Sequence, residues 1–138
     1  MPMYISGYVI SNDETYIIDT ALFDTGASSA NYISQSFVDK YIDIFEPYIL
    51  AHNSSVRLGD STTEVLITHI ITLNISFLDT CSITHEGLLN FSIMKMSIDM
   101  IIGIESILFT FYELILDMLR AANPRQSSHF NLTLQALN

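Results

Sequence analysis

A nearly continuous run of β-branched residues, at positions 65–78 (VLITHIITLNISFL), restricts the fold more than any other stretch of the chain. Val, Ile and Thr favour extended backbone, because their branched side chains pack well on a pleated surface. The run predicts one long or two consecutive buried strands. The turn residues Asp79-Thr80-Cys81-Ser82 follow, and residues 87–96 predict a further strand. A sheet therefore forms the centre of the expected fold.

Two hairpins are predicted around this centre. Residues 3–10 and 15–23 are rich in Tyr, Ile, Val and Thr, and the turn-forming residues 11–14 (SNDE) connect them. Residues 54–67 also alternate between strand and turn composition, with a small polar tip at 59–63. A tip of this composition is typical of an exposed, mobile loop.

Helical spacing is confined to two segments. Apolar residues recur at helical intervals over residues 33–45, where Ser34 is a plausible N-cap and Pro47 is expected to end the helix. Residues 104–122 predict one longer helix, with a polar stripe opposite a broad apolar face. The sequence therefore predicts a mostly β domain with one C-terminal helix.

Composition restricts the class of partner. The chain has 138 residues, 49% of them hydrophobic, which predicts a single folded domain. Fifteen acids against five bases give a net charge of −10 and no basic cluster, so we expect no nucleic-acid or anionic-membrane partner. We assign residues 1–122 to the domain and 123–138 to a tail or linker, in which residues 130–137 are a candidate interface strand.

Compartment and membrane association follow from a few features. The single Cys81 excludes an internal disulfide framework and suits a reducing compartment. The start of the sequence lacks the basic and apolar regions of a signal peptide. The most apolar region, residues 98–119, contains four acidic residues and does not meet the requirement for a membrane span. We therefore expect an intracellular, cytoplasmic protein.

The candidate for chemistry is Asp24, in the stretch Asp24-Thr25-Gly26-Ala27-Ser28. It directly follows an apolar strand. Burying an ionised carboxyl group there costs free energy unless the charge is paired with another group or takes part in a reaction. Thr25 contributes a hydroxyl group, and Gly26 is free to adopt positive φ in a tight loop. An ordinary turn at the end of a strand has the same composition, so three residues alone do not decide between the two readings.

A second motif supplies the context. The sequence around Asp24 continues from Ala21-Leu22-Phe23 to Ser29 and then Tyr32-Ile33-Ser34, and Asp99-Met100-Ile101-Ile102-Gly103-Ile104 leads into the late helix. Over about residues 4–120 this order of motifs resembles the retroviral-type aspartic proteases (retropepsins), especially those of retrotransposons. The resemblance implies an all-β, retropepsin-like acid-protease fold, in which one chain is a closed-barrel-like half that dimerises and no cofactor is bound.

The resemblance also implies the residues of the site. Its catalytic loop would be Asp24, Thr25 and Gly26, its substrate contacts Ala27, Ser28 and the hairpin tip Leu58, Gly59, Asp60 and Ser61, and its support Ile101, Ile102 and Gly103. The implied function is that of an aspartic endopeptidase that processes a retroelement polyprotein.

The expected mechanism requires a homodimer. Hydrolysis by aspartic acids needs two carboxyl groups that share a proton, one acting as general base on water and the other assisting the substrate carbonyl. The chain has one Asp-Thr-Gly, because Asp79-Thr80-Cys81 has Cys in place of Gly and no second apolar-apolar-Gly follows it. The second carboxyl group must then come from Asp24 of another copy across a two-fold axis.

Other readings remain open. The main alternative is a catalytically inactive retropepsin-like module for dimerisation or peptide binding, and a further one is an unrelated β-sandwich or barrel with a chance motif. The four histidines show no metal spacing, since Cys81-x-x-x-His85 is two ligands short of a zinc site, so no metal is expected. We expect Cys81 to be buried as a small hydrophobe and Asp99 to be a strand-end acid without a catalytic role.

Overall fold

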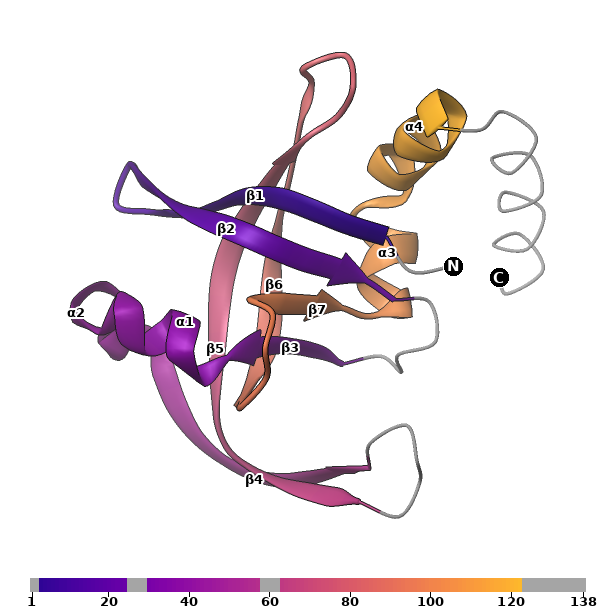
Figure 1. The fold of residues 1–138 in the computed structure, drawn as a ribbon. Helices are drawn as coiled ribbons and strands as arrows, with labels where there is room; N and C mark the ends of the chain where they lie inside the picture. The colour runs from indigo at the N-terminus through magenta and orange to yellow at the C-terminus, as the bar shows by residue number, and fades with distance from the viewer. Residues whose placement is uncertain (1–2, 25–29, 58–62, 123–138) are drawn as a thin grey trace.

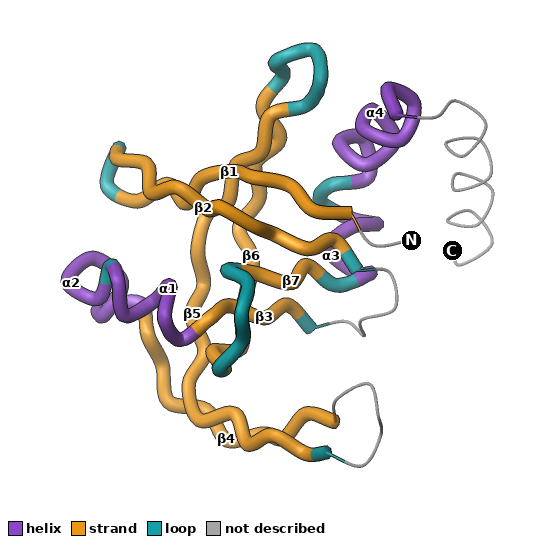
Figure 2. The backbone as a smooth tube through the Cα atoms, in the orientation of Figure 1, coloured by secondary structure: helices purple, strands orange, loops and turns teal. Residues whose placement is uncertain are grey.

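The computed structural model describes residues 3–24, 30–57 and 63–122. In chain order its elements are β1 (Met3–Ser11), β2 (Glu14–Phe23), β3 (Asn31–Ser34), α1 (Gln35–Lys40), α2 (Ile42–Phe45), the short 3-10 helix η1 (Glu46–Tyr48), β4 (Ile49–Arg57), β5 (Glu64–Leu78), β6 (Thr84–Met94), β7 (Met100–Ile102), α3 (Ile104–Phe109) and α4 (Tyr112–Ala122). Strands dominate, as Figure 2 shows, and the prediction of a mostly β fold is confirmed.

The strands form one sheet of seven in the order β1-β2-β7-β3-β6-β5-β4. Residues Tyr8 to Ile10 of β1 also pair with Asn74 to Ser76 of β5, and this contact closes six of the strands into a barrel. The strand β4 lies outside the closed part and extends with the first half of β5 away from the barrel (Figure 1). Closure turns one face of the sheet inward, and the side chains on that face form the core.

The core is apolar and rich in aromatic side chains. Phe77 of β5 packs against both Phe23 and Phe111, with ring centroids 5.1 Å and 5.3 Å away, both in edge-to-face geometry. Edge-to-face pairs are favourable because the positive edge of one ring meets the negative face of the other. All three side chains are at most 2% exposed, so residues from β2, β5 and the α3–α4 junction meet at the centre of the molecule.

Both hairpin predictions are confirmed where the structure describes them. Asn12 and Asp13 connect β1 and β2 with φ values of 53° and 63°, the left-handed conformation that the tightest hairpin turns require. The run at 65–78 belongs to a single long strand, β5, which pairs with β4, β6 and β1. The expected polar tip at 59–63 falls almost wholly outside the described residues, although Arg57 and Glu64 pair on either side of it.

The helix expected at 33–45 is shorter than predicted and is divided. Ile33 lies in β3, which continues to Ser34. The side-chain oxygen of Ser34 accepts a hydrogen bond from the amide of Phe37, so Ser34 is the N-cap as predicted. Two short helices follow, and Pro47 lies within η1, after the end of the helical segment. At the side of the barrel where β3 leads into them, α1 and α2 cover the core (Figure 1).

The single helix predicted at 104–122 is wrong, because the chain forms two helices there. The amides of Thr110 and Phe111 both donate to the carbonyl oxygen of Ser106, at 2.9 Å and 3.0 Å, and the regular helical bonding stops. The break turns Phe111 inward to the aromatic core, while Phe109 remains 75% exposed. Both halves are amphipathic, so the spacing of apolar residues does not reveal the break. Among the described residues, no helix has the length and apolar character needed to cross a membrane.

Candidate active site

Asp24 follows β2 directly, and its backbone is held by β7. Residues Ala21 to Phe23 pair in parallel with Met100 to Ile102, and the amide of Asp24 then donates to the carbonyl oxygen of Ile102 at 3.0 Å. The strand β2 is buried at this end, since Ala21 is fully inaccessible and Phe23 is 2% exposed. Asp24 itself is half-buried. The acid therefore stands where a buried strand reaches the surface.

The strand β7 lies between the two strands that flank the Asp24 loop. Leu22 of β2 pairs with Ile101 on one side, and Tyr32 of β3 pairs with Ile101 on the other, antiparallel. Ile102 is fully buried and Gly103 is also buried, whereas Ile101 is partly exposed. The structure thus brings two motifs that are distant in the sequence to adjacent positions in one sheet.

The other predicted site residues cannot be placed. Thr25, Gly26, Ala27 and Ser28 lie outside the described residues, and so does the hairpin tip of Leu58, Gly59, Asp60 and Ser61. The described ends of β4 and β5, which carry that tip, point toward the same side of the molecule as the end of β2 in Figure 1. The candidate interface strand at 130–137 also falls outside the described ranges.

Asn31 is a part of this region that the sequence analysis does not identify. Its side-chain oxygen accepts a hydrogen bond from the amide of Gly103 at 2.9 Å, and its side-chain nitrogen donates to the carbonyl oxygen of Asn90 at 3.3 Å. The residue is 6% exposed, so both polar groups are removed from water and both are satisfied within the protein. The sequence shows only that a polar residue begins an otherwise apolar segment, which the structure identifies as the buried strand β3. It does not show which groups the side chain of Asn31 would bond.

Asp99 connects three strands at the opposite end of β7. One of its carboxylate oxygens accepts from the amides of Asp19 and Thr20, at 2.7 Å and 3.4 Å. Its own amide donates to the carbonyl oxygen of Thr20, and its carbonyl oxygen accepts from the amide of Ser34. These bonds agree with the interpretation of Asp99 as a structural acid at a strand end. They hold β2, β3 and β7 together four to five residues before Asp24 and two residues before Ile101.

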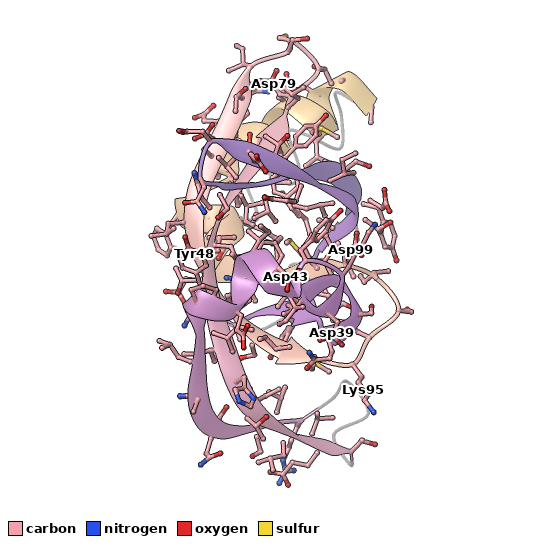
Figure 3. The ribbon with its side chains drawn as sticks, turned by 90° about the vertical axis from the view of Figure 1, so that its left-hand side faces the viewer. Asp39, Asp43, Tyr48, Asp79, Lys95 and Asp99 are labelled. Atoms are coloured by element: carbon pink, nitrogen blue, oxygen red, sulfur yellow. The ribbon has the colours of Figure 1, made fainter. Side chains whose placement is uncertain are left out.

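Asp79-Thr80, which resembles the start of the Asp24 motif, belongs to a turn at a different place. Figure 3 shows Asp79 at one end of the molecule, well away from Asp99. Its carboxylate accepts from the amides of Cys81 and Ile83 and from the Nε2 of His85, which lies 2.9 Å from Oδ2. The hydrogen bond from His85 is the main cause that lowers the pKa of Asp79 below its ordinary value, and the bond from the Ile83 amide adds to it. This acid shapes the turn between β5 and β6.

The same turn is hydrogen-bonded to α4. The amide and the hydroxyl group of Thr80 both donate to the carboxylate of Asp117, at distances of 2.8 Å to 3.0 Å. Cys81 is exposed, so the expectation that it is buried as a small hydrophobe is wrong. Its Sγ and one oxygen each of Asp79 and Asp117 lie within 4.8 Å of one another. Since backbone and hydroxyl donors already engage both carboxylates, the group is explained as a connection between the turn and the helix.

An open hollow of about 360 Å³ lies beside the start of β3. Its walls come from β3, β6 and α3, and they comprise Ala30, Asn31, Leu88, Leu89, Asn90, Ser92, Glu105, Ser106, Phe109 and Thr110. Leu88 and Phe109 are the most exposed large apolar side chains of the described chain, at 72% and 75%. The hollow adjoins the exit of the Asp24 loop but does not contain Asp24.

Fold and site together define a closed β barrel in which an aspartate directly after β2 is held by a short apolar strand, and a glycine follows that strand. No protein-family model matches the sequence, and a search of curated proteins finds no similar one.

Proposed function

We propose that this chain is an aspartic endopeptidase of the retropepsin type, which cleaves peptide bonds as a homodimer and processes a retroelement polyprotein. The observation that carries the proposal is the hydrogen bond from the Asp24 amide to the Ile102 carbonyl oxygen. It joins the Asp-Thr-Gly stretch to the apolar-apolar-Gly stretch, the two motifs on which the resemblance to retropepsins depends. A closed barrel built from β strands also agrees with the retropepsin-like fold that we propose.

A second copy of the chain supplies the second carboxyl group in this proposal. Asp79, which begins the sequence most similar to a second Asp-Thr-Gly, already accepts the hydrogen bonds that shape its turn, and this turn lies at one end of the molecule. The dyad therefore consists of Asp24 and Asp24 of the second copy, related by a two-fold axis. Neither copy has an active site alone.

The chemistry divides two roles between the two aspartates. One carboxylate takes a proton from a water molecule, and the protonated partner donates a hydrogen bond to the carbonyl oxygen of the scissile peptide. The attacking water forms a bond to the carbonyl carbon, and the leaving nitrogen receives a proton as the C–N bond breaks. Thr25 braces the two loops, Gly26 lets the substrate backbone approach, and Ala27 and Ser28 contact the peptide. The hairpin that includes Leu58, Gly59, Asp60 and Ser61 closes over it and excludes water.

The test compares purified wild-type protein with Asp24→Asn on a peptide library between acidic and neutral pH. Wild-type protein should cleave, a pepstatin-type inhibitor should block cleavage, and Asp24→Asn should lower the rate by at least about 10³-fold, because an amide can neither accept nor share the catalytic proton. Asp43→Asn is the matched control, since Asp43 is an exposed acid on α2 and its loss should leave the rate unchanged.

Sedimentation of the same samples separates the alternatives. Cleavage by the wild type should appear only at concentrations where the dimer is populated. A verified dimer without cleavage would instead favour the inactive dimerisation or peptide-binding module. Cleavage that survives in Asp24→Asn, or cleavage by a strict monomer, would contradict the two-aspartate mechanism.

A further inference from the structure

A single peptide group lies between the two ends of the Asp24 loop. The carbonyl oxygen of Ile102 accepts the hydrogen bond from the amide of Asp24, at 3.0 Å. The N–H of the same peptide group, which belongs to Gly103, donates to the side-chain oxygen of Asn31, at 2.9 Å. Asp24 is the last residue before the loop, and Asn31 is the first residue of the strand that leaves it. One rigid unit therefore holds both ends.

We propose that Asn31 is a positioning residue for the catalytic aspartate, acting on Asp24 through the Ile102–Gly103 peptide group. This inference rests on the proposed protease function for its catalytic consequence, although the coupling of the two hydrogen bonds does not depend on it. Asn31 is 72 positions from Gly103 in the sequence, and no motif on which the resemblance depends includes it.

The coupling follows from the chemistry of the amide group. A peptide group is planar and its C=O and N–H point in opposite directions, so orienting the N–H toward Asn31 also fixes the direction in which the carbonyl oxygen points. A donor that is already engaged polarises the group and makes its oxygen a stronger acceptor. Asn31 thus controls both the orientation and the strength of the bond that Asp24 makes.

The side chain at position 31 needs both functions of an amide. Its oxygen accepts from Gly103, and its nitrogen donates to the carbonyl oxygen of Asn90 on β6. The second bond sets the plane of the side chain, because the β3–β6 ladder places Asn31 beside Phe91, the neighbour of Asn90. At 6% exposure, the Asn31 side chain satisfies these groups away from water, so its removal leaves the Gly103 N–H without an acceptor from the protein.

The first test uses hydrogen exchange measured by NMR on wild-type protein and needs no activity. Each amide is compared with core amides such as that of Ile75, which report global opening. If one peptide group couples the two bonds, the amides of Asp24 and Gly103 should exchange through the same opening, with protection that agrees within about threefold. An Asp24 amide that exchanges more than about tenfold faster than that of Gly103 would show independent opening and overturn the inference.

The second test uses Asn31→Ala, with Asn90→Ala as the matched control. Asn90 has the same side-chain type on the adjacent strand but is exposed, and its backbone carbonyl remains in place for Asn31. Asn31→Ala should lower the protection of Asp24 and Gly103 about tenfold relative to the core amides, and Asn90→Ala should not. With the concentration of active sites set by titration with a pepstatin-type inhibitor, kcat should fall about tenfold in Asn31→Ala while KM stays within about twofold.

Asn31→Asp distinguishes a positioning role from a packing role. It keeps the size of the side chain and an oxygen for Gly103, so protection of the Asp24 amide should fall less than in Asn31→Ala. Equal losses in the two variants, or an unchanged kcat per titrated site in Asn31→Ala, would overturn the inference. Absence of cleavage by wild-type protein, together with coupled exchange of the two amides, would reject the protease and leave the coupling intact.

Discussion

Closure of the barrel depends on a glycine in β1, and Gly7→Ala should destabilise the fold. The pairing of β1 with β2 shifts between Ile5 and Gly7, and directly after this shift Tyr8 begins the contact with β5. A Cβ atom added to Gly7 would lie 2.4 Å from Cδ1 of Phe77 and 2.6 Å from the carbonyl oxygen of Ser76. Both distances are far below van der Waals contact, so β1 or β5 has to move.

Neither Phe77 nor the carbonyl group of Ser76 can move away from the added Cβ atom without a loss of folding stability. Phe77 is fully buried and makes edge-to-face contacts with Phe23 and Phe111, and the Ser76 oxygen belongs to the backbone of the central strand. Overpacking of this kind costs about 1–3 kcal/mol, and the backbone contact places Gly7→Ala in the upper part of that range. Replacing glycine in a strand normally gains about 0.5–1 kcal/mol from the unfolded chain. The expected net loss is about 2 kcal/mol, which corresponds to a Tm lower by about 6–10 °C in a domain of this size.

Urea denaturation followed by circular dichroism measures the free energy of unfolding. Gly87→Ala is the control: its added Cβ would meet Cγ2 of Thr110 at 2.1 Å, but that methyl group ends a side chain that can change rotamer. It should therefore lose less stability than Gly7→Ala. A Gly7→Ala protein as stable as the wild type or more stable, as strand propensity alone predicts, would refute the steric reasoning.

Two further substitutions test the turn at Asp79 and the helix break. Because the folded protein lowers the pKa of Asp79, its carboxylate contributes stability above the ordinary carboxyl pKa of about 3.9, and the contribution is lost as pH falls through the lower folded value. Asp79→Asn should therefore be less stable than the wild type at pH 5–7, with the difference in unfolding free energy narrowing below about pH 4; a difference independent of pH would contradict this. Phe111→Ala should cost about 3–5 kcal/mol in chemical denaturation, since Phe111 is fully buried, whereas the exposed Phe109→Ala should stay within about 0.5 kcal/mol; equal losses would contradict the inward turn at the break.

The elements that the sequence predicts well are those encoded by neighbouring residues. Asn12 and Asp13 tolerate positive φ, and the short β1–β2 turn needs that conformation, so the hairpin follows from the local sequence. Ser34 caps a helix because its side chain reaches an amide only three residues on. The run at 65–78 forms one strand because β-branched residues recur along its length and it contains neither Gly nor Pro. In each case the residues that determine the element are close to one another in the sequence.

The features that the sequence does not predict depend on distant partners. The break at Thr110 occurs because Phe111 reaches an aromatic cluster built from β2 and β5, and the amphipathic pattern is the same with or without it. Asn31 is an ordinary polar residue until β7 and β6 supply its two partners. Cys81 is exposed because the turn that contains it is held by Asp117, which is 36 positions away.

The same distinction applies to the candidate site. The sequence singles out Asp24 and Ile101-Ile102-Gly103 as separate motifs, and only the parallel pairing of β2 with β7 places them side by side. The backbone of Asp24 is then held by the carbonyl group of Ile102, and a backbone group carries no signal in the residue types. Side-chain motifs can therefore indicate a candidate acid, but the backbone groups that hold it have to be identified from the fold.

Closure within one chain has a consequence for assembly. The β1–β5 contact completes the barrel, and the core and the bond that holds Asp24 are formed without contribution from a second copy. In the proposed enzyme, folding and the formation of half a site are thus properties of the monomer, whereas catalysis belongs to the dimer. In that enzyme, the affinity between copies would set the concentration at which activity begins. A protease embedded in a polyprotein would be inactive while dilute and become active when many copies are brought together.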